Sequence, residues 1–301
     1  MAETEVRIEP LSAPGRRSRT LDPSVAARLR GDLGFRVLML ALSLIATVPL
    51  VLILVYIVVK GASSINWQFL TELPKPMGVA GGGISNAIVG TVILVAIATV
   101  ISVPLGVIAG IFLSERSKSR LGTVARLSVE TLMGIPSIVL GIVAYTWIVR
   151  PSGHFSALSG GVSLAMIMLP VITLSTEETL LLIPLSLREA ALALGVSYRR
   201  TVMRVILPAG MSGIITGVLL AVARGAGETA PLLFTAFGNP FLAVNILKPM
   251  ESLPHTIFYY ATSPYPAWQA LAWGASFVLL VIILTLNVVT KLVTSRWKIQ
   301  F

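Results

Sequence analysis

The sequence has no cysteine among its 301 residues, which excludes disulfide bonds, thiol chemistry and thiolate metal sites. Charge is also scarce, because only 12% of the residues are charged, whereas a soluble domain carries about 25%. Hydrophobic residues make up 55% of the chain and the mean hydropathy is +0.89, more apolar residues than one soluble core would bury. The same abundance excludes an intrinsically disordered chain. The composition therefore indicates a membrane protein.

The sequence also lacks the motifs of several enzyme classes. It has no G-x-x-x-x-G-K-[ST] loop for the phosphates of a nucleotide, so any ATP is expected to be handled by another subunit. H-E-x-x-H and G-x-S-x-G are absent as well, and His154 and His255 lie far apart in predicted outer loops. We expect each histidine to be a solvated loop residue. We expect no catalytic residue, no metal site and no cofactor.

Six stretches of the sequence are long enough and apolar enough to cross a bilayer, for which a helix needs about 20 residues. We therefore predict an all-α membrane protein with six transmembrane helices in a domain of residues 35–301. The approximate bounds of these helices are 37–59, 84–113, 128–149, 160–180, 210–234 and 268–290. Each of the first four spans contains a proline near its middle, so kinked helices are expected. These prolines are Pro49, Pro104, Pro136 and Pro170.

Lysine and arginine are divided unevenly between the two ends of the predicted spans. Eighteen of the 23 fall in the N-terminal tail, in loops 114–127 and 184–208, and at the C-terminus. Four fall in the alternate loops: Lys60, Lys75, Arg150 and Lys248. Because cationic loops are retained in the cytoplasm, both termini are predicted to be cytoplasmic, and residues 1–34 to form a basic, largely disordered tail there. The net charge of +10 then reflects topology, and no nucleic-acid partner is expected.

The loop between the fourth and fifth predicted spans, residues 184–208, has the pattern of two short helices. The first is rich in alanine and breaks at Gly195, because glycine adopts the positive φ of a helix end at little cost. The second is predicted to start near Ser197, as an N-cap, and to end before Pro208. Such a helix-turn-helix on the cytoplasmic surface fits a groove of a soluble partner. An amphipathic connector lying on the lipid surface is the alternative.

This loop resembles the EAA loop of ABC importer permeases, whose pattern is E-A-A-x3-G-x9-I-x-L-P. The matching residues are Glu189, Ala190, Ala191, Gly195, Leu207 and Pro208. Val205 stands where the family usually has isoleucine, which is a conservative exchange. The resemblance implies a type I ABC importer permease, in which these residues dock on a separate ATP-binding subunit and couple it to the pore. It disfavours the lipid-surface connector.

Arg224 and Glu228 lie inside the fifth predicted span, after an uncharged run from residue 205 to residue 223. A charge near the middle of a span costs about 2.5–3.5 kcal/mol on insertion scales, so both are expected to pair or to face water. The i, i+4 spacing places them on one helix face. An arginine in such a place can bind two oxygens of a tetrahedral oxyanion. A structural ion pair between helices, which never contacts substrate, is the alternative.

Three segments are similar to phosphate-uptake ABC permeases of the PstA type. They are Arg224 with Gly227–Ala236, Gly82–Thr91 without Ser85, and Gly134–Val139. The resemblance implies that Arg224, Glu228 and Thr229 line the substrate path of a phosphate importer in the bacterial cell membrane. It also implies the partners, which are a PstC-type second permease subunit, two ATP-binding subunits, an external phosphate-binding protein and membrane lipid. A permease for another oxyanion, such as molybdate or sulfate, and a non-transporting scaffold or sensor remain alternatives.

Overall fold

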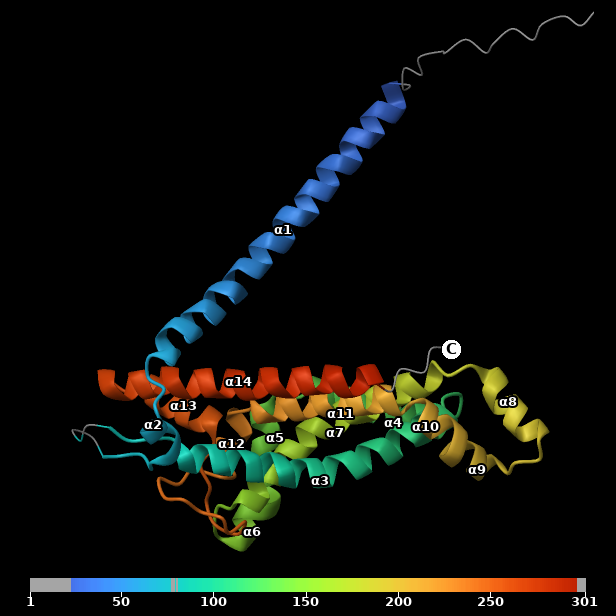
Figure 1. Ribbon diagram of the computed structural model, residues 1–301. Coiled ribbons are helices and arrows are strands. Elements are labelled where there is room, and N and C mark those ends of the chain that lie inside the picture. Colours follow the sequence, from blue (N-terminus) through green and yellow to red (C-terminus); the bar gives the residue numbers. More distant parts are fainter. Residues whose placement is uncertain (1–22, 77–78, 80, 297–301) are drawn as a thin grey trace, which may run out of the picture. The chain divides into compact units, whose positions relative to one another are not determined.

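The computed structural model describes residues 23–76, 79 and 81–296 (Figure 1). In these residues every regular element is a helix, and one isolated bridge joins Phe237 to Met250. The chain divides into two units, residues 1–54 and residues 55–301. The all-α fold predicted from the sequence is confirmed for the described part of the chain.

The first unit contains most of helix α1 (Pro23–Ala62). Its apolar side chains from Leu33 onward are exposed, as expected of a helix that faces lipid. The helix begins at Pro23, so the prediction of a largely disordered segment up to residue 34 was wrong for its last twelve residues. Proline suits the first turn of a helix, and Arg36 forms an i, i+4 ion pair with Asp32 at 2.8 Å. Residues 1–22 lie outside the described part.

The second unit contains the remaining helices, and Figure 1 labels its α-helices in chain order. They include two π-helical turns, η1 and η2. The bounds are α2 (Trp67–Thr71), α3 (Ser85–Glu115), α4 (Arg120–Gly134), α5 (Ser137–Ala144), η1 (Tyr145–Val149), α6 (Arg150–Ser152), α7 (Ala157–Leu181), α8 (Leu185–Ala193), α9 (Tyr198–Thr201), η2 (Val202–Ile206), α10 (Leu207–Ala209), α11 (Met211–Ala226), α12 (Ala230–Leu233), α13 (Leu253–Ala261) and α14 (Pro266–Arg296).

Helix α7 is the centre of the second unit. It packs most extensively against α3 and also against α11, which in turn contacts α14. Figure 1 shows α3, α11 and α14 running side by side. The main core cluster includes Leu94 of α3, Leu164 and Met168 of α7, and Ala221 of α11, each almost completely buried. The most buried helix therefore connects the elements that carry the candidate sites.

Close helix packing in this core depends on glycine. Gly106 and Gly110 lie four residues apart on α3 and face α7. A Cβ atom at Gly110 would lie 2.5 Å from Cβ of Thr176, and one at Gly106 would lie 2.8 Å from Cγ2 of Ile172. Small residues at this spacing allow two membrane helices to approach closely. A larger residue at Gly106 or Gly110 would therefore collide with α7.

Four described helices are long and apolar enough to cross a membrane: α1, α3, α7 and α14. Two bent pairs complete six spans if each pair crosses as one, namely residues 120–134 with 137–152 and residues 198–209 with 211–226. The six-span fold is thus retained, but two spans are not the continuous helices that the sequence predicted. The pairs bend by 103° and 66°.

The predicted continuous helix 128–149 was wrong because the chain breaks at Ile135 and Pro136. Ile135 is extended, with φ −73° and ψ 130°, as expected of a residue that precedes proline. The predicted helix 210–234 was also wrong, since α11 ends at Ala226. Pro49, Pro104 and Pro170 lie inside continuous helices, α1, α3 and α7 respectively.

Candidate functional site

Arg224 lies in the last turn of α11, and Glu228 follows the end of that helix. Their side chains form the predicted ion pair, with Nε of Arg224 3.7 Å from Oε1 of Glu228. The predicted shared helix face was wrong, because the helix ends before Glu228 is reached. Gly227 caps the helix, with its N–H donating to the carbonyl of Arg224, and glycine is a poor helix former. The pair therefore bridges a helix end and the segment beyond it.

Arg224 faces the break between α4 and α5. A small cavity beside its side chain is lined by Leu132, Met133, Ile135, Ser137, Leu140 and Ile167. Helix α5 starts at Ser137 without a capping side chain, so its first backbone N–H groups have no helical partner. A helix N-terminus and a guanidinium at one place both favour a negative charge. The break thus places the N-terminus of α5, a second group that favours an anion, near Arg224.

The Arg224 side chain is 47% exposed and that of Glu228 is 19% exposed. A guanidinium has five N–H donors, and one contact of 3.7 Å leaves most of them available. Thr229 precedes α12 at the N-cap position and makes no side-chain capping bond there. The three residues predicted for the substrate path are therefore adjacent. Their contact with an anion stays a prediction.

The predicted coupling loop forms two helical segments separated by a sharp turn. Helix α8 ends at Ala193, and Gly195 has φ +77°, the left-handed conformation that glycine adopts without strain. Ser197 occupies the N-cap position of α9 but makes no side-chain capping bond. The second segment does not end before Pro208, contrary to the prediction. It runs without interruption through the π-turn η2 into α10, which contains Pro208.

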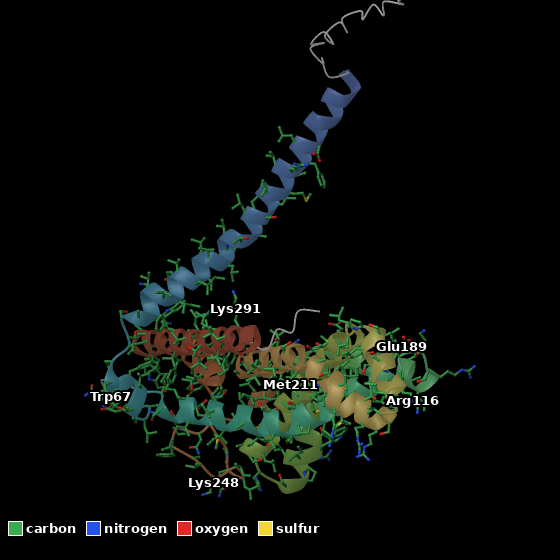
Figure 2. All side chains as sticks on the ribbon, turned by 45° about the vertical axis from the view of Figure 1, so that its right-hand side comes forward. Trp67, Arg116, Glu189, Met211, Lys248 and Lys291 are labelled. Carbon is green, nitrogen blue, oxygen red and sulfur yellow. The ribbon has the colours of Figure 1, made fainter. Side chains whose placement is uncertain are left out.

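The surface of this loop suits docking. Glu189 and Ala190 are exposed, whereas Ala191 is buried. Leu185 and Leu194 are 71% and 84% exposed, so two large apolar side chains of the loop are available to a partner. Leu207 is half-buried and Pro208 exposed at the far end of the loop. Figure 2 shows Glu189 at the end of the second unit that carries Arg116, opposite Trp67.

Two ion pairs that join distant helices were not found from the sequence. Arg188 of α8 binds Glu115, the last residue of α3, and Arg126 of α4 binds Glu177 of α7. The partners are 73 and 51 residues apart. A single sequence gives no local signal for such pairs, because each arginine has several acidic residues available to it.

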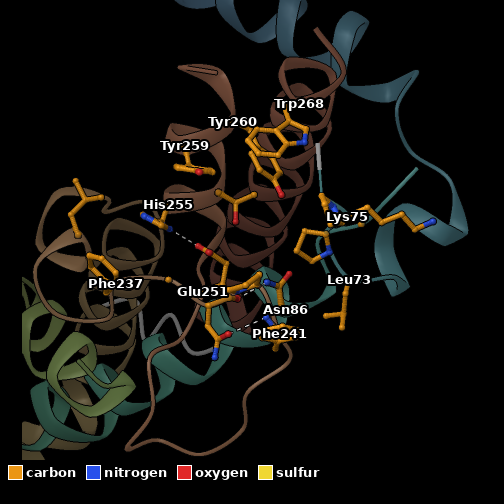
Figure 3. Close-up of a pocket in the computed structure, with 18 residues that line it drawn as sticks. Leu73, Lys75, Asn86, Phe237, Phe241, Glu251, His255, Tyr259, Tyr260 and Trp268 are labelled. Atoms are coloured by element: carbon orange, nitrogen blue, oxygen red, sulfur yellow. Dashed lines mark hydrogen bonds and ion pairs between the residues drawn. The ribbon is translucent and has the colours of Figure 1, made fainter. Parts of the chain in front are cut away.

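The second unit also contains a cavity of about 750 Å³ near α13, at the end that carries Trp67. Figure 3 shows Phe237 and His255 on one side of it and Leu73 and Lys75 on the other. His255 was expected to be a solvated loop residue, but it lies in α13 with a side chain only 16% exposed. Its Nδ1 is 2.6 Å from Oε1 of Glu251.

The helix that carries His255 has a sequence signal that was overlooked. Ser252 accepts a hydrogen bond from the N–H of His255, and Pro254 stands in the first turn. Serine as N-cap followed by proline is a standard helix start. The pKa of nearby Tyr260 is raised to about 12, chiefly by burial and then by the charge of Glu251, so this hydroxyl remains a hydrogen-bond donor. Among the described residues, no group of three or more His, Cys, Asp or Glu is placed to hold a metal ion.

Comparison with known proteins identifies the family. Residues 102–299 match the family of binding-protein-dependent transport system inner membrane components. The phosphate transport system permease protein PstA of Yersinia pestis is 43% identical over 263 residues, which are 87% of this chain and 89% of that protein. The chain belongs to the PstA family. Its PstA relatives include the protein of Haemophilus influenzae, 40% identical over 87% of this chain and 94% of that protein, and a probable PstA of Methanocaldococcus jannaschii, 37% identical over 82% and 88%.

Solved structures support the same fold for this PstA-family chain. A chain of the inward-facing MetNI methionine ABC transporter aligns with a TM-score of 0.59, over 71% of this chain and 97% of that one. Another crystal form of MetNI aligns with a TM-score of 0.54. The identities are 18% and 20%, so these likenesses concern the fold alone. The fold is that of a type I ABC importer permease, as the EAA loop indicated.

Proposed function

We propose that this chain is the membrane-spanning permease subunit of an ATP-driven ABC importer of inorganic phosphate and forms one half of the translocation pore. Membership of the PstA family supports the substrate class. The observation that carries the proposal is the half-exposed Arg224 in an apolar segment, beside the break between α4 and α5. A cation in a membrane span is retained where it faces a water-filled path or a charged partner.

Phosphate at neutral pH is a tetrahedral anion, and the planar guanidinium of Arg224 can bind two of its oxygens at once. Glu228 holds the guanidinium between passages, and the anion displaces this 3.7 Å contact as it arrives. The Thr229 hydroxyl supplies one further donor. Because the contact with Glu228 is loose, breaking it costs less than breaking a close two-pronged pair would cost.

The chain is proposed to have no ATPase site of its own and to need partners. Two ATP-binding subunits dock on the exposed loop of residues 184–208, where the coupling residues are Glu189, Ala190, Ala191, Gly195, Leu207 and Pro208. A PstC-type subunit supplies the other half of the pore, and an external phosphate-binding protein delivers the anion. The assembly is placed in the bacterial cell membrane with both termini of this chain in the cytoplasm. Lipid surrounds it, and neither a cofactor nor nucleic acid takes part.

The test is phosphate uptake by the complete transporter in a strain that lacks other phosphate transporters, with sulfate and molybdate as competitors. The proposal predicts uptake that requires the ATP-binding subunits and that unlabelled phosphate inhibits, whereas sulfate and molybdate do not. Inhibition by sulfate or molybdate would favour the permease for another oxyanion. Normal phosphate uptake in a strain without this chain would mean that the chain does not transport phosphate and would favour a role as a scaffold or sensor.

A further inference from the structure

One guanidinium connects the coupling loop to the long helix α3. Arg188 donates from Nη1 to Oε2 of Glu115 at 2.9 Å and from Nη2 to Oε1 at 2.5 Å. Nη1 is also 3.3 Å from the Tyr198 hydroxyl, and the guanidinium lies 5.8 Å from the centre of that ring. A single side chain of α8 therefore contacts the end of α3 and the start of α9.

This contact differs from an ordinary surface ion pair. The side chains of Arg188 and Glu115 are 23% and 12% exposed, so water screens the pair less than it would at the surface. Two parallel bonds fix the angle between the groups as well as their distance. The next residue of α8, Glu189, is exposed on the docking side of the loop. Arg188 thus points to the membrane domain while its neighbour points to the surface.

Helix α3 extends from this contact to the other end of the second unit. Its 31 residues span about 46 Å at 1.5 Å per residue. Glu115 is its last residue, whereas Asn86, in its first turn, lines the cavity near α13. Between these ends, Gly106 and Gly110 hold α3 against α7. Because Glu115 is part of α3, a displacement of Glu115 also moves the helix that extends to the opposite end of the second unit.

We propose that Arg188 is a positioning residue that transmits movement of the ATPase-docked loop to α3 through its two-pronged contact with Glu115. The inference rests on the proposed function, because it requires an ATP-binding subunit on residues 184–208. Tyr198 orients the guanidinium so that α8 and α9 move as one piece. The exposed coupling residues bind the ATPase, and Arg188 carries the resulting motion into the membrane.

The experiment uses the purified complete transporter in lipid vesicles and measures two quantities for each variant. The first is the amount of ATP-binding subunit that co-purifies with the chain. The second is the stimulation of ATP hydrolysis by phosphate-loaded binding protein, normalised to that amount. The wild-type complex is measured first, and absence of stimulation there would overturn the proposed function rather than this inference.

The variants are Arg188→Glu, Glu115→Arg and the double exchange of both. We expect each single change to reduce normalised stimulation about fivefold or more, as coupling free energies of 1–3 kcal/mol imply. The double exchange restores opposite charges and should recover most of it. Arg116→Glu is the matched control, since it makes the same charge change at an exposed neighbour that forms no ion pair with any residue the structure describes. Normalised stimulation should be unaffected by it.

Two results would overturn the inference. In one, the single variants carry less ATP-binding subunit but stimulate normally per subunit, so the pair only braces the docking surface. In the other, the double exchange is no better than the worse single variant. If the reversals fail to assemble, Arg188→Lys keeps the charge without the two-pronged contact. Its stimulation should then fall while assembly persists, and wild-type stimulation would contradict the role.

Discussion

At the scale of single residues, the proposed function depends on side chains whose neighbours come from other parts of the chain. Arg224 could be recognised from the sequence, because a charge in an apolar run is conspicuous. The sequence did not show that Arg224 lies beside the break between α4 and α5. That break lies about 90 residues earlier in the sequence and depends on Pro136. Arg188 had no signal beyond its place before the E-A-A pattern. Its partner Glu115 is identified only by the fold.

The first prediction separates an anion receptor from a structural pair at Arg224. If Arg224 only pairs with Glu228, removing both charges should be tolerated, because no unpaired charge remains buried. If Arg224 receives the anion, the Arg224→Ala, Glu228→Ala double variant should remain inactive however well it inserts. The measurement is phosphate uptake normalised to membrane abundance, and we expect no recovery over the single variants.

Arg224→Lys refines this prediction. It keeps the positive charge but loses the planar fork, so uptake should be partial at best. Full uptake by the double-alanine variant would eliminate the receptor role and leave Arg224 as a structural residue.

The second prediction concerns Gly195. A Cβ atom there would meet no neighbour within 4 Å, so a substitution strains only the backbone, at φ +77°. Gly195→Val should cost about 1–2 kcal/mol in the loop and weaken docking of the ATP-binding subunit, at unchanged membrane abundance. Gly195→Asn is the control, because asparagine tolerates this conformation. Normal co-purification of the ATPase and normal uptake by the valine variant would show that the turn is not part of the coupling surface.

At the scale of elements, long apolar runs were predictable and breaks within them were not. Helices α1, α3, α7 and α14 contain the predicted spans because each run exceeds the bilayer thickness and carries no competing signal. The broken third and fifth spans have proline or glycine at the break, but prolines in α3 and α7 cause no break. The sequence alone does not distinguish these cases, because neighbouring helices decide which lost hydrogen bonds are compensated.

The third prediction tests the packing of α11 on α7 at Gly217. A Cβ atom there would lie 2.0 Å from Oγ and 2.5 Å from Cβ of Ser175. Gly217→Ala should therefore destabilise the protein by about 1–3 kcal/mol through overpacking. Thermal unfolding in detergent and membrane abundance are the measurements. Gly34→Ala is the control, since nothing lies within 4 Å of that position.

A second change identifies the cause. Ser175→Gly removes both clashing atoms, so the double variant should regain most of the stability lost by Gly217→Ala. Loss of stability that Ser175→Gly does not relieve would mean that the two helices are not packed at this point.

At the scale of the whole molecule, the second unit has two chemically different ends. One end carries α2 and the cavity with His255 and Glu251, and the other carries the coupling loop. The uneven distribution of lysine and arginine predicts that the coupling loop lies in the cytoplasm, where ATP is available. Charge distribution and motif thus agree on one orientation, although they depend on different residues.

The last prediction tests that orientation by labelling, for which the chain provides a background free of cysteine. Single cysteines are introduced by Ser18→Cys and Gln300→Cys near the termini, and by Pro76→Cys and Lys248→Cys in the predicted outer loops. A thiol reagent that cannot cross the membrane should modify the last two in intact cells and the first two only after permeabilisation. Because six crossings return the chain to its starting side, both termini must behave alike. Labelling of one terminus from outside would mean an odd number of crossings, so one bent helix pair would enter and leave the membrane on the same side.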